Sequence, residues 1–157
     1  ILSAIGRQGR GGSFRLMPET DVLLGIAEAC RRYDIKNAVI VSAIGSLHDV
    51  KYCNVVEMPE KKVGYGYSEA LTLSGPIEMT GASGIVCHDD NGEINLHVHF
   101  TMSDRYGTGH GGHLVEGTKV LITVDVVVAE LEGIDMCREY DEYTDVFLFS
   151  PRQLPAE

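Results

Sequence analysis

The sequence predicts an α+β domain that has one principal N-terminal helix and a mainly antiparallel sheet. Apolar residues recur at helical spacing over residues 19–33. From residue 38 onward, β-branched and apolar residues instead form short runs that alternate with glycine-rich or polar turns. The connections between these runs are short, which favours antiparallel pairing, because parallel strands need long crossovers.

The chain is expected to fold as a single domain. Its 157 residues suit one hydrophobic core, and neither a repeat nor a linker divides it. Residues 1–12 end in Gly-Arg-Gln-Gly-Arg-Gly-Gly and are predicted to be a flexible N-terminal segment. Residues 13–150 are predicted to form the domain, and residues 151–157 a C-terminal tail.

The predicted elements begin with a short strand over residues 13–17 and the helix over residues 19–33. Pro18 precedes this helix, and proline is favoured at the start of helices. The apolar residues of the helix share one face, which can pack on a sheet. They are Val22, Leu23, Ile26, Ala27, Cys30 and Tyr33.

Strands are predicted for most of the remaining chain. They cover residues 38–43, 47–56, 69–73, 77–79, 83–88, 93–101, 119–131 and 146–149. Residues 89–92, Asp-Asp-Asn-Gly, are expected to form a hairpin turn, because Asn-Gly tolerates positive φ. Residues 104–112 are glycine-rich and are predicted to be a loop.

The composition limits the classes of function. The net charge is −10, so the surface as a whole repels phosphate backbones. Residues 1–36 carry six basic groups against four acidic ones, which makes them the mildly basic part of the chain. No apolar stretch approaches the ~20 residues of a membrane helix, and no export signal is recognised, so we expect a cytoplasmic protein without membrane partners.

The cysteines give no pattern of a metal or redox motif. Cys30, Cys53, Cys87 and Cys137 are far apart in sequence, and Cys-x-x-Cys is absent. We therefore expect four free thiols, buried or half-buried, in a reducing compartment.

The strand over residues 93–101 carries the strongest candidate for a functional site. Side chains alternate between the two faces of a strand, so His97 and His99 point the same way. Their Cβ atoms are expected ~7 Å apart, and two metal–nitrogen bonds of ~2.1 Å can span that gap to a shared zinc ion. The pair predicts two ligands of a divalent metal, for which zinc is the first candidate.

A third ligand is expected from Gly-His-Gly-Gly-His at residues 109–113. We favour His113 over His110, because His113 lies next to the long strand at residues 119–131 and is better fixed. Three histidines leave one coordination position open, as in catalytic rather than structural zinc sites. That position could serve a small polar ligand or substrate, as in a metal-dependent hydrolase or lyase. Alternatively, the histidines hydrogen-bond across a subunit contact or line an anion pocket.

Three further residues have a functional and a structural interpretation. Glu69 begins an apolar strand and is the candidate catalytic residue, as a general base, although a strand-end carboxylate at the surface is the commoner case. Asp125 lies in an apolar run and either orients a ligand histidine or faces solvent at an edge. His48 follows Gly-Ser-Leu and is interpreted as a turn residue rather than a ligand.

Four blocks of the sequence, in order, resemble the PPC domain, the "plants and prokaryotes conserved" domain. They are Ala-Ile-Gly-Ser-Leu at residues 43–47, Glu-Ala-Leu-Thr-Leu-Ser-Gly-Pro-Ile at 69–77, Leu-His-Val-His-Phe at 96–100 and Gly-Gly-His-Leu-Val-Glu-Gly at 111–117. The resemblance implies a PPC-like α+β fold, a homotrimer and, carried over to this chain, His97, His99 and His113 as the family's histidines.

The same resemblance carries a DNA-binding or regulatory label, which is the alternative function. In plants this domain follows an AT-hook, whose Arg-Gly-Arg-Pro core enters the minor groove. Residues 6–12 lack the proline, and Gln8 interrupts the Arg-Gly-Arg core, so the hook is absent. We therefore expect a stand-alone prokaryotic type of PPC domain, with nucleic acid as an improbable partner.

Overall fold

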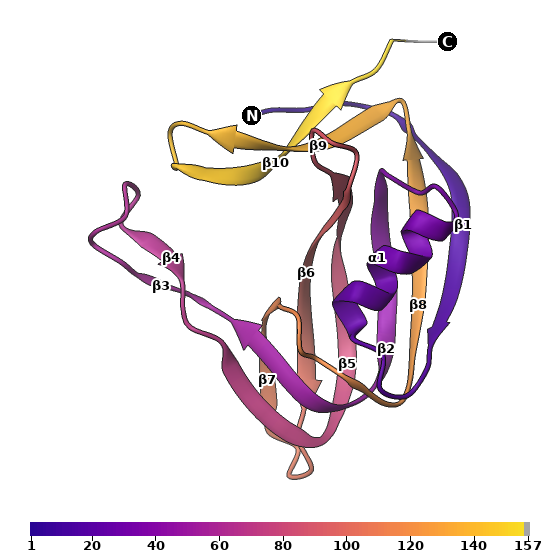
Figure 1. The fold of residues 1–157 in the computed structure, drawn as a ribbon, viewed down its shortest axis with the longest axis vertical. Helices are drawn as coiled ribbons and strands as arrows, with labels where there is room; N and C mark the ends of the chain where they lie inside the picture. Colours follow the sequence, from indigo (N-terminus) through magenta and orange to yellow (C-terminus); the bar gives the residue numbers. More distant parts are fainter. Residues whose placement is uncertain (156–157) are drawn as a thin grey trace.

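The chain folds mostly into β-strands. A computed structural model describes residues 1–155, which form one α-helix and ten strands. The elements are β1 (Arg7–Leu16), α1 (Val22–Arg32), β2 (Ala38–Cys53), β3 (Val55–Glu57), β4 (Tyr65–Tyr67), β5 (Leu71–His88), β6 (Ile94–Ser103), β7 (Gly109–Leu114), β8 (Val120–Glu132), β9 (Ile134–Asp141) and β10 (Val146–Gln153). Eight strands form one sheet in the order β1-β8-β2-β7-β6-β5-β9-β10, and β3 and β4 form a separate arm (Figure 1).

The predicted α+β class is wrong, because strands occupy much more of the chain than helix does. The helix has 11 residues, whereas β2 and β5 have 16 and 18. β5 continues through Gly75-Pro76, which was expected to break it; the ladder with β2 shifts register there, between Leu47 and Asp49. Such a bulge bends a strand without ending it. The sheet is also mixed, because β5 and β9 pair in parallel at His88 and Cys137.

Both ends of the chain are more ordered than predicted. β1 begins at Arg7, so half of the expected flexible segment 1–12 pairs with β8. The neighbouring strand supplies hydrogen bonds to this glycine-rich segment, which local composition does not reveal. β10 extends to Gln153, inside the expected tail of residues 151–157. Residues 156–157 of that tail lie outside the described residues.

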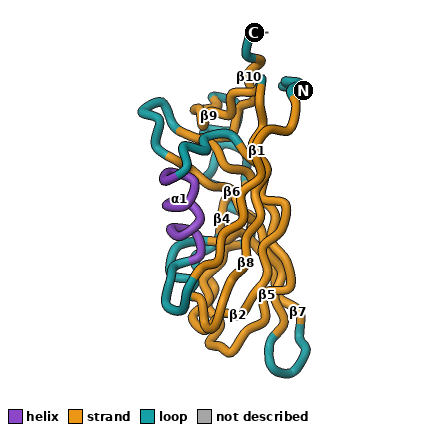
Figure 2. Tube along the Cα trace, turned by 90° about the vertical axis from the view of Figure 1, so that its right-hand side faces the viewer, coloured by secondary structure: helices purple, strands orange, loops and turns teal. Residues whose placement is uncertain are grey.

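The helix begins three residues later than predicted, because Asp21 caps it. One oxygen of this carboxylate accepts the Leu24 amide at 3.1 Å. The other oxygen accepts the Gly117 amide at 2.7 Å, which ties the helix to the turn before β8. The helix covers one face of the sheet (Figure 2). In the described range it is the single helix, and it is not long enough to cross a membrane.

The hydrophobic core lies between α1 and the sheet. Ile26 and Cys30 of the helix are fully buried in the same apolar cluster as Val98 and Phe100 of β6. The predicted alternation along β6 is therefore confirmed, and it leaves the opposite face of this strand for its histidines. All four cysteines are buried and unpaired, as predicted.

β7 closes the part of the sheet that carries the histidines. It pairs along its length with β6, and its last two residues pair with Tyr52 and Cys53 at the end of β2. The expected loop over residues 104–112 is therefore only partly a loop, since β7 starts at Gly109. Strands β2, β5, β6 and β7 are thus linked in a closed circuit that fixes the relative positions of β6 and β7.

Candidate metal centre

The hairpin of β6 and β7 positions three histidines. His97 and His99 project from the same face of β6, and His113 of β7 lies directly opposite His99 in the antiparallel register. The turn between the strands is held by Asp104, whose carboxylate accepts the amides of Tyr106 and Thr108, each at 2.9 Å. Directly opposite side chains have Cβ atoms about 5 Å apart. The register therefore brings the third imidazole to the other two.

The three imidazoles converge on one point. The Nε2 atoms of His97 and His99 are 3.2 Å apart. The ring centroids of His97 and His99 lie 4.9 Å apart, and those of His113 lie 5.2 Å from His97 and 5.5 Å from His99. One nitrogen from each ring lies within 4.8 Å of the others. His97 and His99 are exposed and His113 is half-buried, so solvent reaches the group. The structure thus brings together the three predicted residues.

The arrangement fits a divalent metal ion. Two nitrogens bound tetrahedrally at ~2.0–2.1 Å from one zinc ion lie about 3.3 Å apart, close to the distance between His97 and His99. The Nδ1 atom of His113 is buried without a hydrogen-bond partner among the described residues. An unpartnered buried polar atom is costly, and a cation held by this ring would relieve that cost. An all-imidazole set suits zinc, copper or nickel better than magnesium or calcium.

Burial and mutual repulsion favour the neutral form of two of the rings. Burial, followed by the neighbouring His97, His99 and Arg138, lowers the pKa of His113 to about 4. Burial, followed by His99 and Arg138, also lowers the pKa of His97. Both imidazoles are therefore neutral at pH 7, which is the form that binds metals.

Tyr67 of the β3–β4 arm covers one side of the group. Its ring stacks on His113, with centroids 4.4 Å apart and an interplanar angle of 27°. This contact restricts the rotation of the His113 ring. Tyr67 was not predicted from the sequence, because it belongs to a three-residue strand far from the histidines in sequence.

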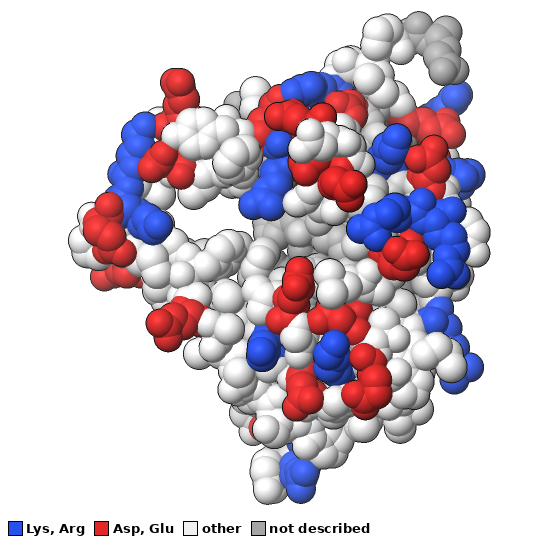
Figure 3. Space-filling view, viewed as in Figure 1, with Lys and Arg blue, Asp and Glu red and all other residues white. Residues whose placement is uncertain are grey.

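A hollow of about 250 Å³ adjoins the histidines. Figure 3 shows the surface hollowed between the β3–β4 arm and the β9–β10 hairpin. Besides His97 and His113, the hollow is lined by Tyr67, Cys87, Asn95, Leu96, Arg138, Phe147, Leu148 and Phe149. Asn95 was recognisable from the sequence, since it shares a strand face with His97. Arg138 and the residues of β10 gave no such signal.

Glu69 and Asp125 lie outside the histidine group. Glu69, the candidate general base, is exposed in the bend that precedes β5. Asp125 is exposed on β8 and accepts a hydrogen bond from the Thr123 hydroxyl at 3.2 Å. Of its two interpretations, exposure to solvent agrees with the structure, but the predicted edge is wrong, because β8 lies between β1 and β2.

The two remaining predicted histidines each have a carboxylate partner elsewhere. His110 Nε2 lies 3.1 Å from Asp104, at the start of β7. His48 lies within β2, not in a turn, with its two nitrogens 3.0 Å from Glu19 and from Asp49. The preference for His113 over His110 thus agrees with the grouping in the structure.

The chain is similar to solved structures over most of its length. A metal-containing protein from Archaeoglobus fulgidus is 28% identical with a TM-score of 0.79, and the match covers 95% of this chain and 99% of that one. A PPC protein from Pyrococcus horikoshii is 27% identical with a TM-score of 0.78, covering 99% and 100%. A Ralstonia eutropha protein, for which DNA binding is proposed, is 19% identical with a TM-score of 0.70, covering 91% and 90%; it shows the fold alone.

The comparison by sequence gives the family. The bifunctional protein GlmU from a Synechococcus strain is 26% identical over 130 residues, which are 83% of this chain and 18% of that protein. The chain thus spans less than a fifth of the length of the curated relatives it matches. The family model of the Plants and Prokaryotes Conserved (PCC) domain, which is the same as the PPC domain, matches residues 3–132. The chain therefore belongs to the Plants and Prokaryotes Conserved domain family.

Proposed function

We propose that this chain is a metal-binding PCC-domain protein in which His97, His99 and His113 hold one divalent cation, with zinc as the first candidate. The observation that carries the proposal is the convergence of one nitrogen from each ring within 4.8 Å. The unpartnered Nδ1 atom of His113 adds support. So does the relative from Archaeoglobus fulgidus, which is a metal-containing protein.

The proposed site leaves room for a small polar ligand or substrate. When bound, the cation would supply Lewis-acid chemistry at the position that three imidazoles leave open, which is the chemistry of a metal-dependent hydrolase or lyase. The residues of the chain would hold the centre: the strand pair fixes the three rings, and Tyr67 limits rotation of His113. The role of Glu69 as a general base stays a prediction, which a Glu69→Gln variant tests once a substrate is known.

Metal analysis of the purified protein tests the proposal. After incubation with zinc and desalting, we expect about one zinc ion per chain in the wild type and almost none in His97→Ala or His99→Ala. His110→Ala is the matched control, because it removes an imidazole that faces Asp104 instead of the group. Unchanged zinc content in the first two variants would overturn the proposal.

We also propose that the chain assembles as a homotrimer. The adjoining strands β2 and β8 expose apolar side chains that favour burial against another copy: Val41, Ile44, Ile122 and Val127 keep 42–64% of their surface accessible. Light scattering after size-exclusion chromatography should give three times the chain mass for the wild type and a smaller particle for Val127→Lys. Leu24→Lys, on the exposed side of α1, is the control.

The second candidate function is a DNA-associated or regulatory role. Its support is the fold shared with the Ralstonia eutropha protein for which DNA binding is proposed. Against it, two of the three arginines of β1 are neutralised, since Arg7 pairs with Glu132 and Arg10 with Glu130. A gel-shift titration at two salt concentrations separates the cases, because phosphate contacts weaken steeply with salt. No shift at low salt would remove this candidate.

A further inference from the structure

The hollow beside the histidines has one permanently charged side chain. Arg138 contributes a guanidinium, and the other lining residues apart from the histidines are apolar, aromatic or neutral polar. Cys87 does not add a charge, because burial raises the pKa of its thiol to about 11. The hollow is therefore positive in a protein whose net charge is −10.

Most of the hydrogen-bonding capacity of Arg138 is free. Its Nη1 donates to the Asn95 side-chain oxygen at 3.2 Å, and no ion pair to this guanidinium is found within residues 1–155. Among the described residues, five other arginines pair with carboxylates, as Arg10 does with Glu130 and Arg31 with Glu28, and the two that do not, Arg15 and Arg105, lie outside this hollow. A guanidinium has five N–H donors in a planar fork. Arg138 thus keeps most of these donors for a ligand.

An apolar wall stands next to this cation. Arg138 on β9 lies directly opposite Phe149 on β10, so the two side chains share a face of the hairpin. Phe147 and Leu148 continue the lining and keep 57% and 43% of their surface exposed. Apolar lining beside a free cation is typical of a site for an amphipathic ligand.

We infer that this hollow binds a small carboxylic acid, with its carboxylate on Arg138 and its apolar part against Phe147, Leu148 and Phe149. One guanidinium fork matches one carboxylate in a bidentate pair and balances its single charge, whereas it would leave one charge of a phosphate dianion unbalanced. The volume of about 250 Å³ is just below that of typical drug-sized sites, which selects a small acid. The inference rests on the proposed function in that the ligand would also reach the open metal position.

Titration with three probes, followed by NMR of the labelled protein, tests the inference. The probes are 3-phenylpropanoate, the uncharged 3-phenylpropanol and the small anion acetate, each added to zinc-loaded and to metal-free protein. We expect 3-phenylpropanoate to bind at least about tenfold more tightly than the other two, with shifts centred on β9 and β10. Arg138→Gln should weaken it by about tenfold or more, the effect of losing a charged hydrogen bond. Arg105→Gln, in the exposed turn before β7, is the control with the same charge change.

The outcomes separate this inference from the proposed function. Zinc binding together with equal 3-phenylpropanoate affinity in Arg138→Gln would overturn the inference and leave the metal proposal standing. If zinc does not bind, but 3-phenylpropanoate binds the metal-free chain in a way that depends on Arg138, the metal proposal is overturned and the inference stands. Equal affinity for 3-phenylpropanol and 3-phenylpropanoate would also overturn the inference, because the charge would then contribute nothing.

Discussion

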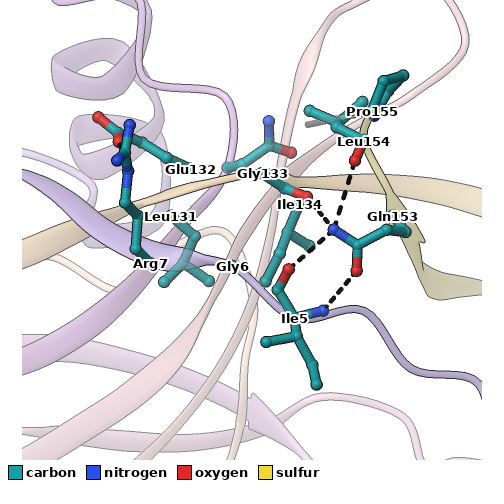
Figure 4. Close-up of a pocket in the computed structure, with 11 residues that line it drawn as sticks. Ile5, Gly6, Arg7, Leu131, Glu132, Gly133, Ile134, Gln153, Leu154 and Pro155 are labelled. Atoms are coloured by element: carbon teal, nitrogen blue, oxygen red, sulfur yellow. Dashed lines mark hydrogen bonds and ion pairs between the residues drawn. The ribbon is translucent and has the colours of Figure 1, made fainter. Parts of the chain in front are cut away.

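Two hollows of the molecule differ in how their polar atoms are satisfied. The larger, about 690 Å³, lies where the N-terminal segment meets β10, and Gln153 is one of its lining residues (Figure 4). The side chain of Gln153 exchanges two hydrogen bonds of 2.8 Å with the backbone of Ile5. It donates two more, to the carbonyls of Gly133 at 3.0 Å and of Leu154 at 3.4 Å. Arg7 at its rim pairs with Glu132.

The smaller hollow, beside the histidines, has the opposite character. The Nδ1 atom of His113 has no partner there, and Arg138 bonds one amide oxygen. The polar groups of the larger hollow bind each other and join residues near the two ends of the chain. Those of the smaller hollow have few partners within the chain. The two hollows therefore differ in how far their polar groups are satisfied within the chain, and not in volume alone.

The largest expected difference between the two hollows is the response of stability to zinc. Zinc at about 1,000 times its dissociation constant should raise the free energy of unfolding by about 4 kcal/mol, because the folded state alone holds the complete site. The gain should persist in Gln153→Ala and vanish in His99→Ala. Urea unfolding with and without zinc measures it, and an equal gain in His99→Ala would show that zinc binds elsewhere.

Acid should destabilise the metal-free protein through His113. The unfolded chain protonates this ring near its ordinary pKa of 6.5, whereas the folded chain protonates it only near a pKa of about 4. The unfolded state thus binds more protons between these values, so the free energy of unfolding falls as the pH falls. We expect a loss of about 1–2 kcal/mol by pH 4, after allowance for solvent screening. Urea unfolding at several pH values should show a flatter profile for His113→Gln.

Removal of the Gln153 side chain from the larger hollow should affect stability but not metal content. Gln153→Ala removes four hydrogen bonds at the surface, and we expect a loss of about 1 kcal/mol. Gln153→Glu keeps the acceptor for the Ile5 amide and should lie in between. Calorimetry measures the loss, and a reduced zinc content in either variant would contradict the independence of the two hollows.

The smallest expected effect comes from the aromatic cover of the histidines. Tyr67→Ala removes the ring stacked on His113 and should weaken zinc binding by about threefold, since such contacts are worth ~0.5–1.5 kcal/mol. Tyr67→Phe keeps the ring and should bind zinc like the wild type. Competition with a zinc chelator gives both constants, and equal affinities for all three proteins would assign Tyr67 no part in the site.

One part of the site could be predicted from residues that lie close together in the sequence. Strand alternation places His97 and His99 on one face, and Asn91-Gly92 predicts the turn before β6. That turn is confirmed, with Gly92 at a φ of 80° and Asp89 accepting the Glu93 amide at 3.0 Å. Each of these features depends on residues only a few positions apart.

The other part depends on pairing between distant segments. β7 resembles a loop because of its glycines, yet Gly112 is what lets the strand pass close to β2: a Cβ atom there would come within 2.7 Å of the Cys53 carbonyl. β9 was not predicted, because its polar residues hide a strand that pairing with β10 stabilises. Arg138 therefore reaches the site through contacts that no local pattern encodes.

Because His113 must lie opposite His99, the metal centre depends on whether the number of residues inserted into β7 is odd or even. One residue inserted within 109–112 would reverse the facing of every later side chain of β7 and carry the third imidazole to the far surface. Two inserted residues would restore its orientation at the cost of displacement along the strand. Extra residues at 105–107 would lengthen only the turn outside the β6–β7 ladder. The hairpin should therefore tolerate length variation in this turn and not in β7.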